Sequence, residues 1–154
     1  MENLIQLRER INTPTLTLVL LTIFSWGIYP MLWLFRYNPM INQALNQSIV
    51  KDGYILAIAI CSGISGVLLG ATEEELIGLG ALLIVAIQVL YIVWGFQAKT
   101  ALEEYLRKEG VTEVKLNPFY TFAFSYFYIN YQINKLSEQA DAIATTQINE
   151  EAVN

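Results

Sequence analysis

The sequence predicts an all-α integral membrane protein, a bundle of four transmembrane helices in a single domain over residues 1–136. Hydrophobic residues make up 55% of the chain and charged residues only 15%, whereas a soluble domain carries roughly 25% charged residues. The charges are also unevenly placed, because the stretches 13–35, 54–72 and 76–98 contain none. Each stretch is close to the roughly 20 apolar residues that a helix needs to cross a bilayer.

The first predicted span covers residues 14–35. Pro14 occupies the first helical position, where its missing N–H costs no hydrogen bond. Pro30 lies inside the span and removes a backbone hydrogen bond, so we expect a kink near Trp26 and Gly27. The kink and the interface after it form the first candidate functional feature, made up of Trp26, Gly27, Tyr29, Pro30, Trp33, Arg36, Asn38 and Asn42.

Two segments outside the spans predict short surface helices. Residues 2–11 place apolar side chains on one helical face, which fits a helix in the membrane interface, although a frayed polar terminus fits them equally well. The Asn-rich linker over residues 36–53 predicts an amphipathic helix that lies flat on the surface. Before it, Trp33 is expected at the interface and Arg36 among the lipid phosphates.

The second predicted span, residues 54–71, is rich in small residues. Gly66 and Gly70 are four residues apart, as are Ala59 and Gly63, and such pairs let helix backbones approach closely. We expect these residues to pack against other helices of the same chain, with a contact face for a homo-oligomer as the alternative. The substitution Gly66→Leu is expected to disrupt this packing.

The third predicted span, residues 76–98, contains one midspan polar side chain, Gln88, for which we expect an interhelical hydrogen bond. The helix is expected to continue beyond the span and to end at Gly110. An acidic hairpin precedes the span, and Thr72 with Glu75 predicts a capping box. Capping and the helix dipole explain these carboxylates better than a metal site does.

The fourth predicted span, residues 117–134, is the shortest and the most polar, and it is dense in aromatic residues. We expect a true crossing, with a three-span protein and a re-entrant or interfacial fourth segment as the alternative. A second candidate interface consists of Asn117, Pro118, Asn130 and Asn134. Residues 137–154 form a polar acidic tail, expected to be disordered or a loose surface helix.

The ends of the first and last spans share a pattern, because Asn-x-x-Ile-Asn occurs at residues 38–42 and again at 130–134. Interface chemistry common to both ends explains this better than an internal repeat. With four spans, the excess of Lys and Arg in the first and third loops favours both termini outside the cytoplasm.

Several classes of function are disfavoured by composition. The chain contains no His, which removes the commonest general base and metal ligand. Cys61 is the single cysteine and lies in an apolar run, and no basic cluster suited to nucleic acid is present. We therefore expect no enzyme activity, no cofactor, no metal and no nucleic-acid partner. The predicted spans also lack the ionisable groups usual in ion-coupled transporters.

Two stretches, LTIFSWGIYPMLWLFRYNPMIN at residues 21–42 and LNPFYTFAFSYFYINYQINKL at residues 116–136, carry a family resemblance. The first resembles the start of domain of unknown function 4234, an uncharacterised family of small bacterial membrane proteins, and the second resembles its closing helix. Pro30 and Pro39 depart from the family's common pattern. The resemblance implies a bacterial membrane protein and transfers no activity.

The function expected from these observations is that of an accessory, scaffolding or regulatory subunit that acts through protein and lipid contacts. The alternative is an oligomeric channel or transporter for small solutes. The expected partners are the lipid bilayer and either further copies of the chain or a larger membrane complex. The expected location is the bacterial inner membrane, as a multi-pass protein.

Overall fold

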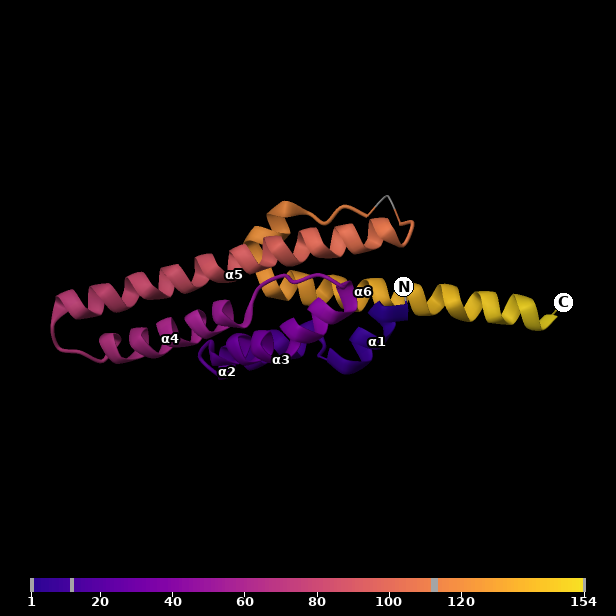
Figure 1. Cartoon of the computed structure of the whole chain (residues 1–154). Helices are drawn as coiled ribbons and strands as arrows, with labels where there is room; N and C mark the ends of the chain where they lie inside the picture. The colour runs from indigo at the N-terminus through magenta and orange to yellow at the C-terminus, as the bar shows by residue number, and fades with distance from the viewer. Residues whose placement is uncertain (1, 12, 112–113, 154) are drawn as a thin grey trace.

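The computed structural model describes residues 2–11, 13–111 and 114–153, without the side chains of residues 2, 4 and 140–153. Within these ranges all regular structure is helical, as predicted. The helices in chain order are α1 (Glu2–Ile11), α2 (Thr15–Phe24), α3 (Ile28–Leu45), α4 (Asp52–Leu69), α5 (Glu74–Lys108) and α6 (Pro118–Val153). Figure 1 shows an elongated molecule in which α4 and α5 form a long antiparallel hairpin, with α1 and the end of α6 toward the opposite end.

Two of the described helices, α4 and α5, are long and apolar enough to cross a membrane. The 18 residues of α4 cover about 27 Å at 1.5 Å per residue, and α5 has 35 residues. They match the predicted second and third spans. α5 also ends as predicted, because Gly110 follows it with a φ of 84° that glycine adopts without strain. A bundle of four crossing helices is not confirmed.

The predicted first span is wrong, because residues 14–35 form two helices rather than one kinked helix. The chain reverses direction between α2 and α3, where Trp26 and Gly27 have positive φ angles of 53° and 83°. The ten residues of α2 cover only about 15 Å. Pro30 is buried in the first turn of α3, where its missing N–H costs no helical hydrogen bond. It therefore starts a helix instead of bending one.

The helix predicted within the linker 36–53 is present as far as Leu45, but it is a continuation of α3 through Pro39 and not a separate surface helix, and residues 46–51 connect it to α4. The predicted fourth span does not run straight. α6 bends at Ser125, whose φ of 40° and ψ of −115° are not helical, and the chain turns back there. A straight crossing by residues 117–134 is therefore not confirmed. Beyond the bend the backbone stays helical through the predicted tail to Val153.

The buried core lies where α1, α3, α5 and α6 meet. Trp33 and Trp94 are almost fully buried there and pack edge to face, with ring centroids 6.0 Å apart. Trp33 is thus a core residue and not the interface residue that the sequence predicted. Leu7 and Ile11 are buried too, so α1 packs onto α3 and α6 and is neither frayed nor a separate surface helix.

Candidate functional site

The backbone N–H groups of the turn between α2 and α3 find their hydrogen-bond acceptors within the turn and α2. The N–H of Gly27 donates to the carbonyl of Thr22 at 2.9 Å, as in the Schellman motif that closes many helices. The N–H of Tyr29 donates to Ser25 Oγ at 2.8 Å, so Ser25, which ends α2, also caps the start of α3 with its side chain. Every N–H of residues 25–29 has an acceptor within this turn or α2. Such a turn does not need water to pair its donors.

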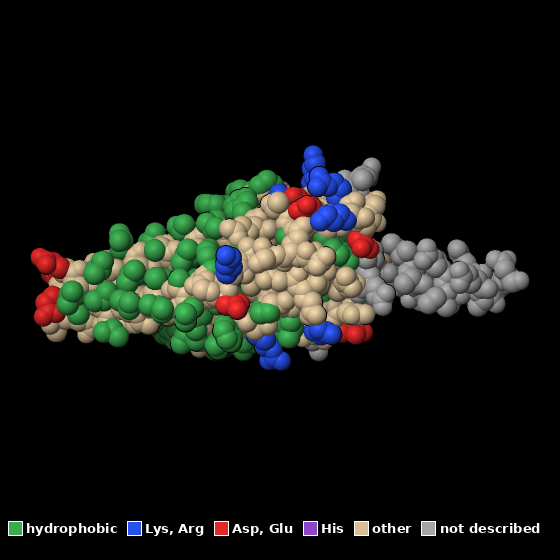
Figure 2. Space-filling view, viewed as in Figure 1, with side chains coloured by type: hydrophobic (Ala, Val, Ile, Leu, Met, Phe, Trp, Pro, Cys, Tyr) green, Lys and Arg blue, Asp and Glu red, His purple; other side chains and the backbone are tan. Residues whose placement is uncertain are grey.

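Large apolar side chains cover the outside of this turn and of the long hairpin (Figure 2). Those more than half exposed on and between α2 and α3 are Leu16, Ile23, Phe24, Trp26, Ile28, Leu32 and Phe35. Those on α4 and α5 are Leu56, Ile60, Val67, Leu82, Val85 and Val89. Phe119, Phe122 and Phe124 continue the surface on the first arm of α6. An exposed apolar surface of this extent marks contact with a membrane or with other proteins.

The charges are separated along the long axis of the molecule. All nine Lys and Arg residues lie outside residues 52–98, and the charged side chains that Figure 2 shows at the tip of the α4–α5 hairpin are acidic. α5 begins at Glu74 with Glu73 as its N-cap and without a side-chain capping bond. The capping box predicted from Thr72 and Glu75 is therefore wrong. Glu74 and Glu75 still lie in the first turn, where the helix dipole favours negative charge.

The Asn pair of the first candidate feature holds the connection between α3 and α4. Asn38 is fully buried, accepts a hydrogen bond from Trp94 Nε1 at 3.0 Å and donates to the carbonyl of Val50 at 3.3 Å. Asn42 Oδ1 accepts from the N–H of Ile49 at 2.9 Å. These side chains stabilise the fold and do not form a polar exit onto the membrane surface.

The second Asn pair holds the connection between α1 and α2 in the same way. Asn130 Nδ2 donates to the carbonyl of Thr13 at 3.0 Å and lies 3.1 Å from Thr15 Oγ1, and Asn134 Nδ2 donates to the same carbonyl at 3.2 Å. Interface chemistry is therefore the wrong explanation for the recurring Asn-x-x-Ile-Asn pattern. In both places an Asn pair one helical turn apart fixes the backbone of a connecting segment.

Two residues that the sequence did not single out fix the bend of α6 against α5. Ser125 Oγ donates to the carbonyl of Tyr91. A Cβ built at Gly95 would lie 2.9 Å from Ser125 Oγ and 3.2 Å from the Cα of Ser125. A side chain at position 95 would collide with the bend. A glycine inside a helix was the only local signal of this contact.

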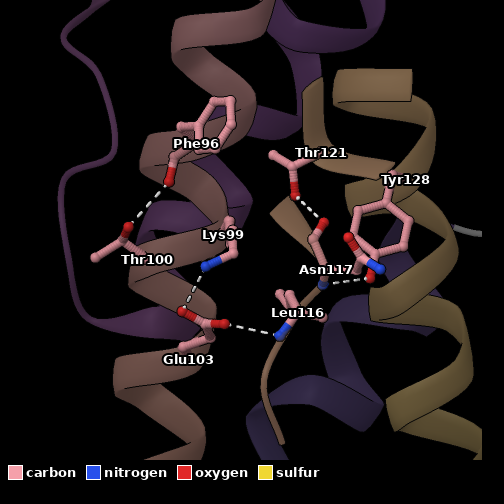
Figure 3. Close-up of polar contacts among 8 residues, drawn as sticks. All are labelled: Phe96, Lys99, Thr100, Glu103, Leu116, Asn117, Thr121 and Tyr128. Carbon is pink, nitrogen blue, oxygen red and sulfur yellow. Dashed lines mark hydrogen bonds and ion pairs between the residues drawn. The ribbon is translucent and has the colours of Figure 1, made fainter. Parts of the chain in front are cut away.

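A cluster of polar contacts joins the loop after α5 to α5 on one side and to α6 on the other (Figure 3). Glu103 pairs with Lys99 at 2.9 Å through one carboxylate oxygen and accepts the N–H of Leu116 at 2.7 Å through the other. The N–H of Asn117 donates to the hydroxyl of Tyr128 at 3.0 Å. The cluster therefore fixes the loop on both sides.

Asn117 and Pro118 form the start of α6. Asn117 Oδ1 accepts the N–H of Phe119 at 2.8 Å, which is the bond of a helix N-cap. Pro118 follows at the first helical position. Arg36, from the first candidate feature, is exposed, and its guanidinium group lies over the ring of Tyr37, 5.4 Å from the ring centroid.

The predicted small-residue face of α4 is not used for packing within the described chain. A Cβ at Gly63 or Gly66 would meet no described heavy atom within 4 Å, and Gly70 is the C-cap of α4. α4 and α5 instead come close at Gly80, where a Cβ would lie 3.1 Å from atoms of α4. Gln88 is exposed and makes no hydrogen bond with the described residues, so the predicted interhelical bond is wrong.

A groove of about 470 Å³ lies between the α2–α3 turn, α4 and α5. It brings together residues from two separately predicted features, Trp26 and Gly27 from the turn and Gly66 and Gln88 from the long hairpin. The remaining residues that line it are Ile28, Met31, Ser62, Ser65, Leu69, Ile84, Ile87 and Tyr91. It is a mostly apolar space with a few hydroxyl and amide groups.

The described residues contain no group of three or more His, Cys, Asp or Glu that could hold a metal ion. Comparisons of the chain with protein-family models, with curated proteins and with solved structures find no match. The resemblance to domain of unknown function 4234 therefore stays a prediction. What is known of the site comes from its own geometry, an apolar hairpin with an acidic tip, a self-satisfied turn beside it and a groove between them.

Proposed function

We propose that this chain is a multi-pass protein of the bacterial inner membrane that acts through contacts with lipid and with other membrane proteins, as an accessory, scaffolding or regulatory subunit. In this proposal the α4–α5 hairpin crosses the bilayer, and the α2–α3 hairpin enters and leaves on one side. The exposed apolar side chains over both hairpins carry the proposal, because in water they would remain uncovered. The self-satisfied turn at residues 25–29 supports it, since lipid offers no hydrogen-bond partners.

The proposed orientation places both termini and the connections 46–51 and 109–117 in the cytoplasm. All nine Lys and Arg residues then lie on the cytoplasmic side, in accord with the positive-inside rule. Only residues 70–73 and the acidic start of α5 face outward. This orientation is opposite to the one expected for four spans, because without crossings by residues 14–35 and 117–134 both termini lie on the same side as the Lys and Arg of the connecting segments.

A partner protein is proposed because the face of α4 around Gly63 and Gly66 is open. Without a side chain at either position, a second helix can approach the α4 backbone closely. That partner is either another copy of the chain or a subunit of a larger membrane complex. No catalytic role is proposed for the described residues.

A second candidate function is an oligomeric channel or transporter for small solutes. It is favoured by the polar side chains of Ser62, Ser65 and Gln88, which lie along apolar helices and could line a path between several copies. Bilayer recordings together with the oligomeric state in detergent test it. A monomer that gives silent recordings would exclude the pore.

Cysteine labelling tests the membrane arrangement. Starting from Cys61→Ser, single substitutions Thr72→Cys, Ser48→Cys and Gln139→Cys are expressed and treated with a membrane-impermeant maleimide. We expect position 72 to react in intact cells and positions 48 and 139 to react only after permeabilisation. Four crossings would place positions 72 and 139 on the same side, so equal labelling of those two would refute the two-crossing proposal.

A further inference from the structure

The groove between the α2–α3 turn, α4 and α5 contains hydrogen-bonding groups that the fold does not use. Ser65 is only 5% exposed, and its hydroxyl makes no hydrogen bond with the described residues. Gln88 also lines the groove without a hydrogen bond to the described chain. By contrast, the hydroxyl of Ser62 donates to the carbonyl of Ile58 at 2.8 Å, the usual arrangement for a serine in a helix.

These groups lie within the apolar part of the hairpin. Gln88 follows the start of α5 by 14 residues, which is about 21 Å along the helix, and Ser65 precedes the end of α4 by four residues, about 6 Å. In a hydrocarbon core about 30 Å thick, both would lie inside the membrane. A polar side chain at that depth is costly unless it meets a polar partner, which makes it a candidate functional position.

The walls of the groove restrict what that partner can be. None of the described residues that line the groove is charged, so a phosphate or carboxylate would be left unpaired. Trp26, Ile28 and Ile84 provide an apolar wall suited to a hydrocarbon chain. The amide of Gln88 and the hydroxyl of Ser65 can both donate to a neutral oxygen.

We propose that this groove binds a neutral, carbonyl-bearing lipid, with Gln88 and Ser65 donating hydrogen bonds to the carbonyl oxygen and the apolar tail lying against Trp26. The inference rests on the proposed membrane insertion, which places the groove among lipids. Two classes of neutral lipid share this chemistry, quinones through the ring carbonyl and diacylglycerols through the ester carbonyl.

The test uses the purified full chain in detergent and three probes: a decyl-substituted benzoquinone, dioctanoylglycerol, and decylbenzene, which has a similar tail and ring but no carbonyl. A ligand that binds only the folded protein raises its unfolding temperature by an amount that grows with the logarithm of the ligand concentration divided by the dissociation constant. We expect a concentration-dependent rise in the unfolding temperature with one or both carbonyl compounds and none with decylbenzene. The probe that gives the rise identifies the lipid class.

Substitutions then locate the binding. Gln88→Leu and Ser65→Ala are each expected to raise the dissociation constant about tenfold, which is the effect of losing one hydrogen bond. Gln97→Leu is the matched control, because Gln97 is exposed on the same helix outside the groove. Circular dichroism checks that each variant is folded.

Three results would overturn the proposal: equal shifts with decylbenzene, no shift with any probe, or unchanged affinity in Gln88→Leu. Crosslinking of two copies across an unliganded groove, with no ligand effect, would overturn it as well and assign the groove to an oligomer. The measurement is made in detergent and does not depend on which side the termini face. Failure of the lipid site and failure of the proposed topology can therefore be told apart.

Discussion

Gly95 lies directly against Ser125, and no side chain would fit between the helix α5 and the bend of α6 at that point. Ser125 itself has a φ of 40° and a ψ of −115°, a sparsely populated backbone conformation that costs about 1–3 kcal/mol. The hydrogen bond from its hydroxyl to the carbonyl of Tyr91 and the close contact with Gly95 offset that cost. The direction of the last helix is thus decided by a glycine 30 positions earlier in the chain.

The first prediction concerns this contact. Gly95→Ala is expected to destabilise the protein by about 1–3 kcal/mol, because the added methyl group overpacks the junction. Gly78→Ala is the matched control, since Gly78 lies in the same helix and its Cβ would meet no described atom within 4 Å. There the greater helix propensity of Ala is expected to stabilise by up to about 1 kcal/mol. Thermal unfolding in detergent measures both, and a neutral Gly95→Ala would mean that the two helices are not in contact.

The second prediction concerns the buried amide of Asn38. Asn38→Leu removes the side-chain amide and leaves its two partners, Trp94 Nε1 and the carbonyl of Val50, buried without that hydrogen bond. We expect a loss of about 2–4 kcal/mol, since each unsatisfied buried group costs about 1–3 kcal/mol. Asn3→Ala, which removes an exposed bond of 3.4 Å, is expected to cost under about 1 kcal/mol. Similar losses in the two variants would show that Asn38 is not in a buried network.

The third prediction concerns the exposed turn. Trp26 is 96% exposed, whereas Trp33 and Trp94 are buried, so most contact between indole and lipid should come from Trp26. In vesicles made with acyl-chain-brominated lipid, wild-type fluorescence is expected to be quenched strongly and that of Trp26→Phe only weakly. Iodide in the aqueous phase is expected to quench neither. Strong iodide quenching that Trp26→Phe abolishes would place the turn in water.

The fourth prediction concerns the loop after α5. Glu103→Gln removes the charge that pairs with Lys99 and weakens the bond to the N–H of Leu116. Hydrogen exchange at residues 114–117 is expected to accelerate about fivefold, because a charge-assisted bond is replaced by a neutral one that is weaker by about 1 kcal/mol. Glu104→Gln, which removes a more exposed carboxylate with a 3.6 Å pair to Lys108, should leave that exchange unchanged. Equal effects would show that the loop is held by other contacts.

The fifth prediction concerns the open face of α4. Gly66→Leu is expected to leave the unfolding temperature of the monomer unchanged or slightly raised, in contrast to the disruption that the sequence suggested, because its Cβ points into open space. If a partner helix packs there, the same substitution abolishes the oligomer or the co-purified partner. Size-exclusion chromatography and affinity purification measure these outcomes. Lower monomer stability would mean that the face is covered within the chain.

The long hairpin could be predicted from sequence because uninterrupted apolar runs determine it locally, and the same holds for the end of α5 at Gly110. The reversal at residues 25–27 could not. Its left-handed positions hold a Trp and a Gly, and a single Gly followed by Pro30 suggests a kink as readily as a turn. The bend at Ser125 has no local signal, because its cause is a contact with α5.

The Asn residues show a different limit of prediction from sequence. Their polarity and their position after apolar runs predict that Asn38 and Asn130 lie at a membrane interface. Their partners are Trp94 and backbone carbonyls in connecting segments, one of them more than 100 positions away. A polar residue beside an apolar run can therefore serve the inside of a fold as well as its surface.

The reversals at residues 25–27 and at Ser125 stop part-way along the α4–α5 hairpin (Figure 1). In the proposed orientation, the inner half of the bilayer accommodates the α2–α3 hairpin in addition to α4 and α5, whereas the outer half accommodates two helices alone. The molecule is then a wedge whose lateral area differs between the two leaflets. Because a closed bilayer relieves unequal leaflet areas by bending, copies gathered in one patch would make the inner face locally convex.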